Sequence, residues 1–281
     1  MSTKGRFLRS GKVKDIYEMD DEHLLFVFSD RVSAFDVILP STIPKKGEVL
    51  CKLAAYWFEY LGVPHHMVRL DGPNSMLVRK MSMIPVECVV RGYLYGSLYE
   101  RLNRGEVQLP GVTNLLAAKL PQPYFDPTTK SEVKDEPITE SEIVSEGRMS
   151  RAELGDVKAS TMEIYRKMCE RAADAGFLLA DLKLEFGRDA RTGRVTLGDS
   201  IGPDEFRMWP ASRYSPGRNQ ESFDKQLVRD WLISQGFKDE LDKARKNGHK
   251  QPAPPLLPPE LIREVSDRYM KVYESLSGRD L

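Results

Sequence analysis

The stretch from Leu179 to Ser200, LADLKLEFGRDARTGRVTLGDS, alternates charged and large apolar residues and then turns back on itself. Asp181, Lys183 and Glu185 lie two residues apart, with apolar residues between them. A period of two is that of a β-strand with one apolar face and one polar face. Arg191-Thr192-Gly193 is typical of a three-residue hairpin loop, because glycine supplies the left-handed conformation that such a loop needs. The segment therefore predicts an antiparallel hairpin with one charged face.

The register of this hairpin decides what the charged face can do. If the loop is those three residues, Ala190 pairs with Arg194, and Glu185 lies directly opposite Asp199 on the same face. Two facing carboxylates repel unless a cation lies between them, and Mg²⁺ takes few carboxylates and leaves its other positions to water and phosphates. We therefore predict that Glu185 and Asp199 bind Mg²⁺. A bulge would shift the pairing by one residue, and a solvated face with a salt bridge is the alternative.

Composition limits the class of protein. The 281 residues are 41% hydrophobic, which suits one large domain or two domains with a sizeable core. Lysine plus arginine and aspartate plus glutamate each number 42, which argues against a general nucleic-acid or membrane-surface binder. The three scattered cysteines offer no disulfide framework or metal spacing and fit a reducing cytoplasm. We expect no signal peptide and no membrane span, and the histidines show no zinc motif.

The order of the segments predicts a mixed α+β protein with a smaller, strand-rich front and a larger back. Apolar spacing predicts a helix over residues 48–61, and two capping boxes start helices at Thr139 and Ser150, the second reaching about Ala175. Residues 120–137, rich in prolines and polar side chains, are expected to form a loop. A final helix pair should be separated by the stiff linker QPAPPLLPP. Strands are expected in the segments KVKDIYEM, HLLFVFSD, 67–70, 76–80 and 86–90.

Two segments could bind a nucleotide. GKVKDIYE places Lys12 and Lys14 two residues apart after a glycine, which suits a phosphate, although a basic strand end is the simpler interpretation. RKMSMIPVE, from Arg79 to Glu87, predicts a strand, a short turn and a strand. Such a connector between two lobes can present main-chain groups to an adenine, and an ordinary loop is the alternative.

Two further segments could bind a substrate anion. In VVRGYLYGS, Arg91 and Ser97 flank two glycines where a strand leads into a helix. Free N–H groups at a helix start and an arginine favour an anion site, with a structural salt bridge and a helix cap as the alternative. In GDSIGPDEFRMWP, the sharp corner after Asp199 should bring Arg207 next to the Glu185–Asp199 pair, where it could be structural or hold a phosphate or carboxylate.

These segments occur in one order that resembles the SAICAR synthetase family. The resemblance rests on GKVKDIYE, SDRVSAFDVILPSTIPKKG, IPVECVVRGYLYGS, FDPTTKSE, LADLKLEFG and GDSIGPDEFRMWP, and it extends from about Gly11 to Trp231. It implies an ATP-dependent ligase that joins carboxyaminoimidazole ribonucleotide (CAIR) to L-aspartate, giving SAICAR, ADP and phosphate in de novo purine biosynthesis. It also implies an ATP-grasp-like fold, with a β-rich lobe over residues 1–85 and a larger α+β lobe over residues 86–281.

The resemblance also implies roles for individual residues around one cavity. The metal ligands would be Glu185 and Asp199, and the nucleotide contacts Lys12, Lys14, Met83, Glu87 and Lys130. The CAIR contacts would be Arg91, Ser97 and Arg207, with Asp36 near the substrates and Asp181 and Lys183 facing the same cavity. Asp181 is a candidate base for the aspartate amine, and the lysines would offset the charge of ATP.

The chain departs from the family pattern at two places. It has DEFRMWP where many members have DSSRFWP, so a glutamate and a phenylalanine replace two serines before Arg207. Hydroxyl contacts to substrate there are in question. After TTKSE it has VKDEPIT in place of a slightly longer stretch with a histidine, so we expect the lid there to close differently.

Two other functions are alternatives to the ligase. A kinase that phosphorylates a hydroxyl would need the same lysines and the same metal pair. A nucleotide sensor without catalysis would not need to hold a metal for phosphoryl transfer. The sequence leaves the oligomeric state open, a homo-oligomer included.

Overall fold

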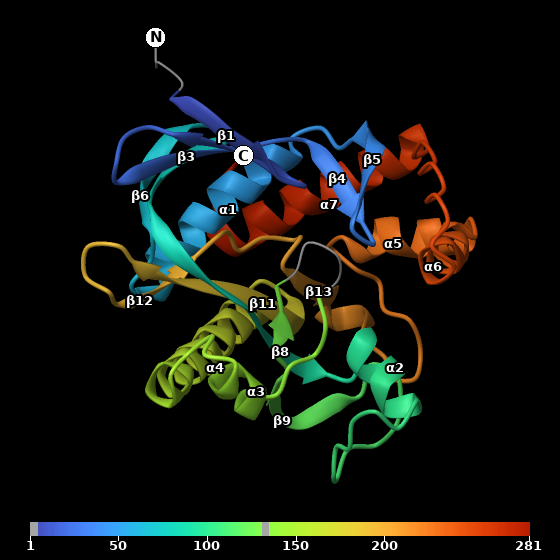
Figure 1. The fold of residues 1–281 in the computed structure, drawn as a ribbon. Coiled ribbons are helices and arrows are strands. Elements are labelled where there is room, and N and C mark those ends of the chain that lie inside the picture. Colours follow the sequence, from blue (N-terminus) through green and yellow to red (C-terminus); the bar gives the residue numbers. More distant parts are fainter. Residues whose placement is uncertain (1–4, 131–134) are drawn as a thin grey trace.

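The computed structural model describes residues 5–130 and 135–281 and shows a mixed α+β protein built around two antiparallel sheets (Figure 1). The first sheet has five strands in the order β1-β2-β3-β7-β6: Arg6–Ser10, Lys14–Glu18, His23–Phe28, Ser75–Arg79 and Met67–Gly72. A separate hairpin consists of β4 (Arg31–Ala34) and β5 (Val37–Thr42). The α+β expectation is therefore confirmed.

The second sheet carries the long strands of the molecule. Its six strands are β8 (Met81–Tyr93), β9 (Lys119–Phe125), β10 (Thr128–Thr129), β11 (Phe177–Asp189), β12 (Val195–Gly198) and β13 (Phe206–Pro210). β11 is central, because it pairs with β8, β12 and β13. Its apolar residues, such as Leu182 and Leu184, are buried, and the predicted alternation is confirmed.

Helices cover the two sheets. α1 (Lys46–Leu61) packs against the first sheet, and α4 (Arg151–Asp174) packs against β11 and β8. Both predicted capping boxes are present, at Thr139 for α3 (Glu140–Ser145) and at Ser150 for α4. The remaining helices are α2 (Ser97–Asn103), a 3₁₀ turn (Ala211–Arg213), α5 (Gln226–Ser234), α6 (Phe237–Lys246) and α7 (Pro259–Ser277).

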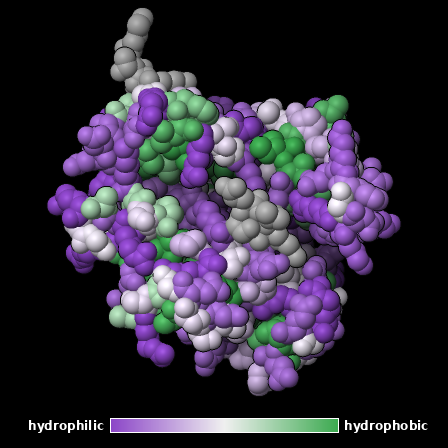
Figure 2. All heavy atoms as spheres, viewed as in Figure 1, coloured by the Kyte–Doolittle hydropathy of each residue, from purple (hydrophilic) through white to green (hydrophobic). Residues whose placement is uncertain are grey.

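The carboxy-terminal helix returns to the amino-terminal part of the chain. α7 lies beside α1 (Figure 1), and one apolar core includes Phe26 and Trp57 together with Leu182 and Tyr269. Phe7 and Leu8 of β1 are exposed, and Figure 2 shows apolar surface gathered over the amino-terminal strands of an otherwise mostly hydrophilic face. In the described part of the chain, no helix has both the length and the apolar character that crossing a membrane requires.

Three expectations about local structure were wrong. β8 runs without a turn through Pro85, and the chain passes from the first sheet to the second at Lys80. β9 occupies part of the segment expected to be a loop, despite Pro121 and Pro123. It pairs only with β8, and an edge strand tolerates proline because its free side needs no N–H donors. Three helices, not two, follow the site region, since α5 and α6 both precede the proline-rich linker.

Two expectations are not settled by these elements. The domain boundary predicted between residues 85 and 86 falls inside β8, so the division at that point stays a prediction. In the VKDEPIT stretch, Val133 and Lys134 lie outside the described residues, as do Ser131 and Glu132 before them.

His66 fixes the end of β12, where the charged hairpin leaves the sheet. Its ring Nε2 lies 2.9 Å from the carbonyl oxygen of Asp199, and its backbone N–H donates to Leu197. Asp199 itself has a φ of 56°, in the left-handed region that is rare outside glycine. His66 is buried, and burial lowers its pKa from 6.5 to about 3. A neutral imidazole that donates from Nε2 therefore holds the strained residue in place.

The buried His66 predicts a specific loss of stability in acid. Its unfolded form binds a proton below pH 6.5 and its folded form does not, so its contribution is complete above pH 6.5 and is lost as the pH falls toward 3. Between pH 7 and pH 5.5 the free energy of unfolding should drop by about 1 kcal/mol more in the wild type than in His66→Gln. Urea denaturation at both pH values measures this difference, and equal losses would contradict it.

Candidate functional site

The charged face of β11 is the centre of the site. Asp181, Lys183 and Glu185 lie on the face opposite the buried leucines, and Asp181 and Glu185 are themselves buried. β8 places Arg91 directly opposite Asp181 and Glu87 directly opposite Glu185. Directly opposite residues share a face of the sheet. One end of this face is therefore rich in carboxylates, and the other combines a carboxylate with arginine.

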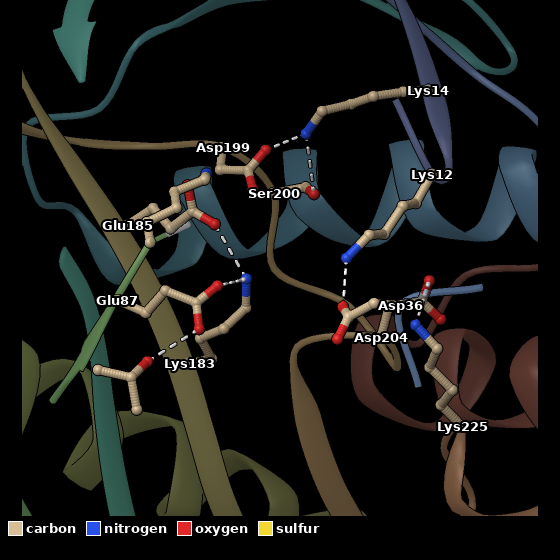
Figure 3. A network of polar contacts seen from close by, with 12 residues as sticks. Lys12, Lys14, Asp36, Glu87, Lys183, Glu185, Asp199, Ser200, Asp204 and Lys225 are labelled. Carbon is tan, nitrogen blue, oxygen red and sulfur yellow. Dashed lines mark hydrogen bonds and ion pairs between the residues drawn. The ribbon is translucent and has the colours of Figure 1, made fainter. Parts of the chain in front are cut away.

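The predicted pairing of Glu185 with Asp199 was wrong by one residue. Glu185 lies opposite Gly198, and the hairpin begins with Arg188 opposite Val195. Asp199 follows the last residue of β12 and adopts the left-handed conformation held by His66. The two acids nevertheless belong to one polar network, in which both side chains lie near Lys183 (Figure 3). The acid directly across from Glu185 is Glu87, which the sequence assigned to the adenine connector.

Lysines neutralise the carboxylate-rich end. The Nζ of Lys183 lies 2.9 Å from both Glu87 Oε1 and Glu185 Oε1, and Lys130 forms an ion pair with Glu185 Oε2. Burial alone would lower the pKa of Lys183, but the charges of Glu185 and Glu87 outweigh it and raise the pKa well above its usual value. Lys183 thus stays charged between two acids that would otherwise repel.

Asp199 is paired with a different lysine, Lys14. Lys14 from β2 forms an ion pair with Asp199, and its Nζ lies 3.5 Å from Ser200 Oγ and 4.6 Å from the centre of the Phe26 ring. Burial would raise the pKa of Asp199, but Lys14 and Lys183 lower it far below the usual range. The first sheet thereby supplies a cation to the second sheet, as Figure 3 shows.

The donor set fits a hard divalent cation. Glu185 and Asp199 are carboxylates whose oxygens are paired with lysine ammonium groups, which occupy the position a cation would take. The described residues contain no group of three or more histidine, cysteine, aspartate or glutamate side chains placed to hold a metal. Mg²⁺ needs only one or two protein carboxylates when phosphates are present, so this pair suits Mg²⁺ better than zinc.

The other end of the charged face is built from arginines. Arg207 of β13 lies opposite Asp181 and forms an ion pair with it, and Arg91 Nη1 lies 3.6 Å from the same carboxylate. Arg91 also donates to Asp126 at 2.6 Å and to Ser97 Oγ at 3.0 Å. Arg207 therefore lies beside Asp181, not next to the Glu185–Asp199 pair as the sequence suggested.

A glycine makes room for Arg207. Gly96 has a φ of 56°, and a Cβ at this position would lie 2.9 Å from Nη2 of Arg207. Only a residue without a side chain fits both constraints. The YGS sequence before α2 thus serves the packing of the arginine as well as the start of the helix.

The remaining predicted residues lie at the edge of the network. Lys12 pairs with Asp36, whose φ is 64°, and both side chains are exposed enough to reach a ligand. Met83 is 37% exposed and lies against Gly187 and Gly198. A Cβ at Gly187 would lie 3.1 Å from the sulfur of Met83. The two glycines therefore leave room for the apolar side chain of Met83 beside the acids.

Sequence reasoning missed a second group of buried charges. Lys46 at the start of α1 lies 2.8 Å from Asp204, which also accepts from the Tyr269 hydroxyl at 2.9 Å. Lys225 lies 3.8 Å from Asp204 and 3.3 Å from Ser33 Oγ, and burial lowers its pKa to about 8.

Arg229 of α5 is a further missed cation. Burial and the charge of Arg207 lower its pKa, so the two guanidinium groups lie within electrostatic reach of each other. Both Arg229 and Lys225 belong to the segment SFDKQLVRDWL. The family resemblance includes this segment, but no sequence pattern in it indicates a functional site.

Comparisons with known proteins show the family of this chain. The family model described as SAICAR synthetase matches residues 7–244. A curated relative from Nitrosopumilus maritimus, named phosphoribosylaminoimidazole-succinocarboxamide synthase, is 51% identical over 98% of this chain and 99% of its own. The solved SAICAR-synthase from Saccharomyces cerevisiae, complexed with SAICAR, superimposes with a TM-score of 0.83 at 30% identity, covering 100% of this chain and 97% of its own.

A second solved structure that is similar to this chain contains a nucleotide. It is a SAICAR synthetase in complex with ADP, with a TM-score of 0.73 at 26% identity, covering 97% of this chain and 98% of its own. These likenesses extend over nearly the whole chain, and they support the ATP-grasp-like, two-lobed α+β fold that the resemblance implied. The chain belongs to the SAICAR synthetase family of carbon–nitrogen ligases.

Proposed function

We propose that this chain joins the carboxylate of CAIR to the amine of L-aspartate, with ATP converted to ADP and phosphate, through an acyl phosphate. The observation that supports it is the division of one buried strand face into a carboxylate–lysine end and an arginine end. Asp181 and Glu185 are four residues apart on β11, which is about 13 Å along a strand. That span separates a nucleotide phosphate site from a substrate anion site.

The nucleotide belongs at the carboxylate–lysine end. Lys14 and Lys130 already neutralise carboxylates there, and Lys12 lies on the same amino-terminal edge with an exposed ammonium group. ATP phosphates would draw these lysines away from their present partners. Met83 would offer its exposed side chain to the adenine, and Glu87, held by Lys183, would lie between the adenine side and the metal.

Glu185 and Asp199 would hold Mg²⁺. When bound, the ion would neutralise charge on the nucleotide phosphates during phosphoryl transfer. Lys183 would remain beside Glu185 and supply a fixed positive charge to the transferred phosphoryl group, because the charges of Glu185 and Glu87 raise its pKa well above the usual value.

The ribonucleotide belongs at the arginine end. Arg91 and Arg207, with Ser97 beside them, would bind the CAIR phosphate or carboxylate, and Arg229 would add a third guanidinium group. Asp36 would lie near the substrates once Lys12 turns to the nucleotide. Asp181 would orient the two arginines. The role of base fits Asp181 poorly, because its carboxylate is already paired with Arg207 and lies 3.6 Å from Arg91.

The charged face can then carry out the reaction in two steps. A carboxylate is a poor electrophile, so its oxygen first takes the γ-phosphoryl group of ATP and becomes part of an acyl phosphate. The amine of aspartate then attacks the carbonyl carbon, and phosphate leaves with the electron pair of the broken C–O bond. Positioning and charge neutralisation dominate such a transfer, and the lysines and arginines of the site supply both.

A kinase acting on a hydroxyl would use the same lysines. The release of inorganic phosphate distinguishes the two functions, because the ligase should release it only when CAIR and aspartate are both present. A kinase would leave the phosphoryl group on its acceptor, and a sensor would not turn over ATP.

We expect Glu185→Gln to reduce kcat by about 10²-fold or more while the thermal unfolding midpoint changes little. The substitution keeps the shape of the side chain and removes one preorganised charge. Steady-state kinetics measures the loss, with the exposed Glu163→Gln as a matched control. A variant that keeps near wild-type turnover would remove Glu185 from the phosphoryl-transfer site.

We expect Arg207→Ala to raise the KM for CAIR by at least about tenfold and to change the KM for ATP far less. Loss of a charge-assisted hydrogen bond to an anion is typically about 1.5–3 kcal/mol, which is roughly tenfold or more in binding. The exposed Arg213→Ala is the control from the neighbouring segment. An equal rise for both substrates would exclude Arg207 from the CAIR site.

A further inference from the structure

Glu205 is a partly buried acid that the mechanism above does not use. It lies in the turn before β13, where its backbone N–H donates to Gly202 at 2.9 Å and its carbonyl accepts from the Lys183 N–H at 2.8 Å. The second of these bonds ties it to β11 at the middle of the charged face. This chain has Glu205 where many members of the family that it resembles have a serine.

The carboxyl group of Glu205 lacks a partner. Its Oε2 is buried and has no hydrogen bond to any described residue. An unsatisfied buried carboxyl is costly, because it loses water without gaining a donor. A Cβ at Gly202 would meet Leu50 at 2.9 Å and Glu205 Oε2 at 3.5 Å. The absence of a side chain at Gly202 therefore makes room for Leu50, and the carboxyl lies at ordinary contact distance from this position.

Charged groups face this carboxyl from both halves of the network. Lys183, Lys14 and Asp199 act on it from the phosphate side, and Asp204 acts on it from the second group of buried charges. Lys225 and Tyr269, which contact Asp204, are also within its electrostatic reach. Glu205 therefore lies where the phosphate site meets the buried charges around Asp204.

We propose that Glu205 is the subsite for the reacting amine of the amino-acid substrate and accepts its proton when the C–N bond forms. This rests on the proposed function. As an ionised base, the carboxyl needs a donor, and the phosphates and carboxylates of the substrates are acceptors. The amine brings N–H donors and is the group that must lose a proton. As nitrogen bonds to the acyl carbon, the C–O bond to phosphate breaks, and the proton passes to the Glu205 oxygen.

The electrostatics suit this role. Burial, reinforced by the charge of Asp204, raises the pKa of Glu205 to about 8. A base works best when its pKa lies near the working pH, because it is then both available and strong enough to take the proton. A serine hydroxyl at the same place could not accept a proton in this range.

The test separates attack by the amine from formation of the acyl phosphate. Hydroxylamine is largely unprotonated at neutral pH and attacks acyl phosphates directly, giving a hydroxamate and phosphate. We expect Glu205→Gln to lower kcat for aspartate coupling by at least about 10²-fold, while hydroxamate formation from ATP, CAIR and hydroxylamine stays within about threefold of wild type. The exposed Glu240→Gln is the matched control and should change neither rate.

Two results would overturn the proposal. One is aspartate coupling by Glu205→Gln within about threefold of wild type, and the other is an equal loss of both reactions, which would make Glu205 a residue of CAIR binding or folding. A wild-type enzyme that couples aspartate without trapping a hydroxamate would contradict the acyl phosphate instead. In that case the kcat–pH profile still tests Glu205 as the base. Loss of the acid limb in Glu205→Gln, when the wild type shows it, would support this role. An acid limb that persists in the variant would exclude Glu205 as the base.

Discussion

The structure depends on a row of charges buried on one face of β11. Asp181, Lys183 and Glu185 project from a strand whose other face is part of the apolar core, so their spacing is fixed by the period of the strand. Buried charges are tolerated only when they neutralise one another. Opposite charges come from Arg91 of β8 and Arg207 of β13 at one end, and from lysines at the other, where Lys183 also pairs with Glu87 of β8.

A bound ligand would replace one partner in some of these ion pairs. Removing one partner from a buried ion pair is strongly destabilising, whereas exchanging it for another charge of the same sign is not. Lys14 and Lys130 come from separate segments of the chain and hold carboxylates that suit a divalent cation. Their ion pairs keep the network balanced without ligand, and nucleotide phosphates offer the same lysines an equivalent partner.

The sequence predicted the parts of the fold that follow local rules. The period of β11, the apolar face of α1 and the capping boxes at Thr139 and Ser150 depend on neighbours within a few residues. The prediction failed for the hairpin register, which hydrogen bonds within the loop decide, and for the second group of buried charges, which distant contacts decide. The hairpin register changed by one because Asp189 accepts from the loop N–H groups of Arg191, Thr192 and Gly193. The cluster around Asp204 joins α1, α5 and α7, and no local pattern brings those segments together.

The central claim is that Glu185 and Asp199 share one divalent cation with the nucleotide phosphates. A crystal structure with ADP and Mn²⁺, which prefers the same oxygen ligands as Mg²⁺, tests it most directly through the anomalous signal of the metal. The account predicts one anomalous peak bridging the two carboxylates and the phosphates, with Lys14 and Lys130 moved from the acids to the nucleotide. A peak away from both carboxylates, or side chains that turn apart from each other, would contradict it.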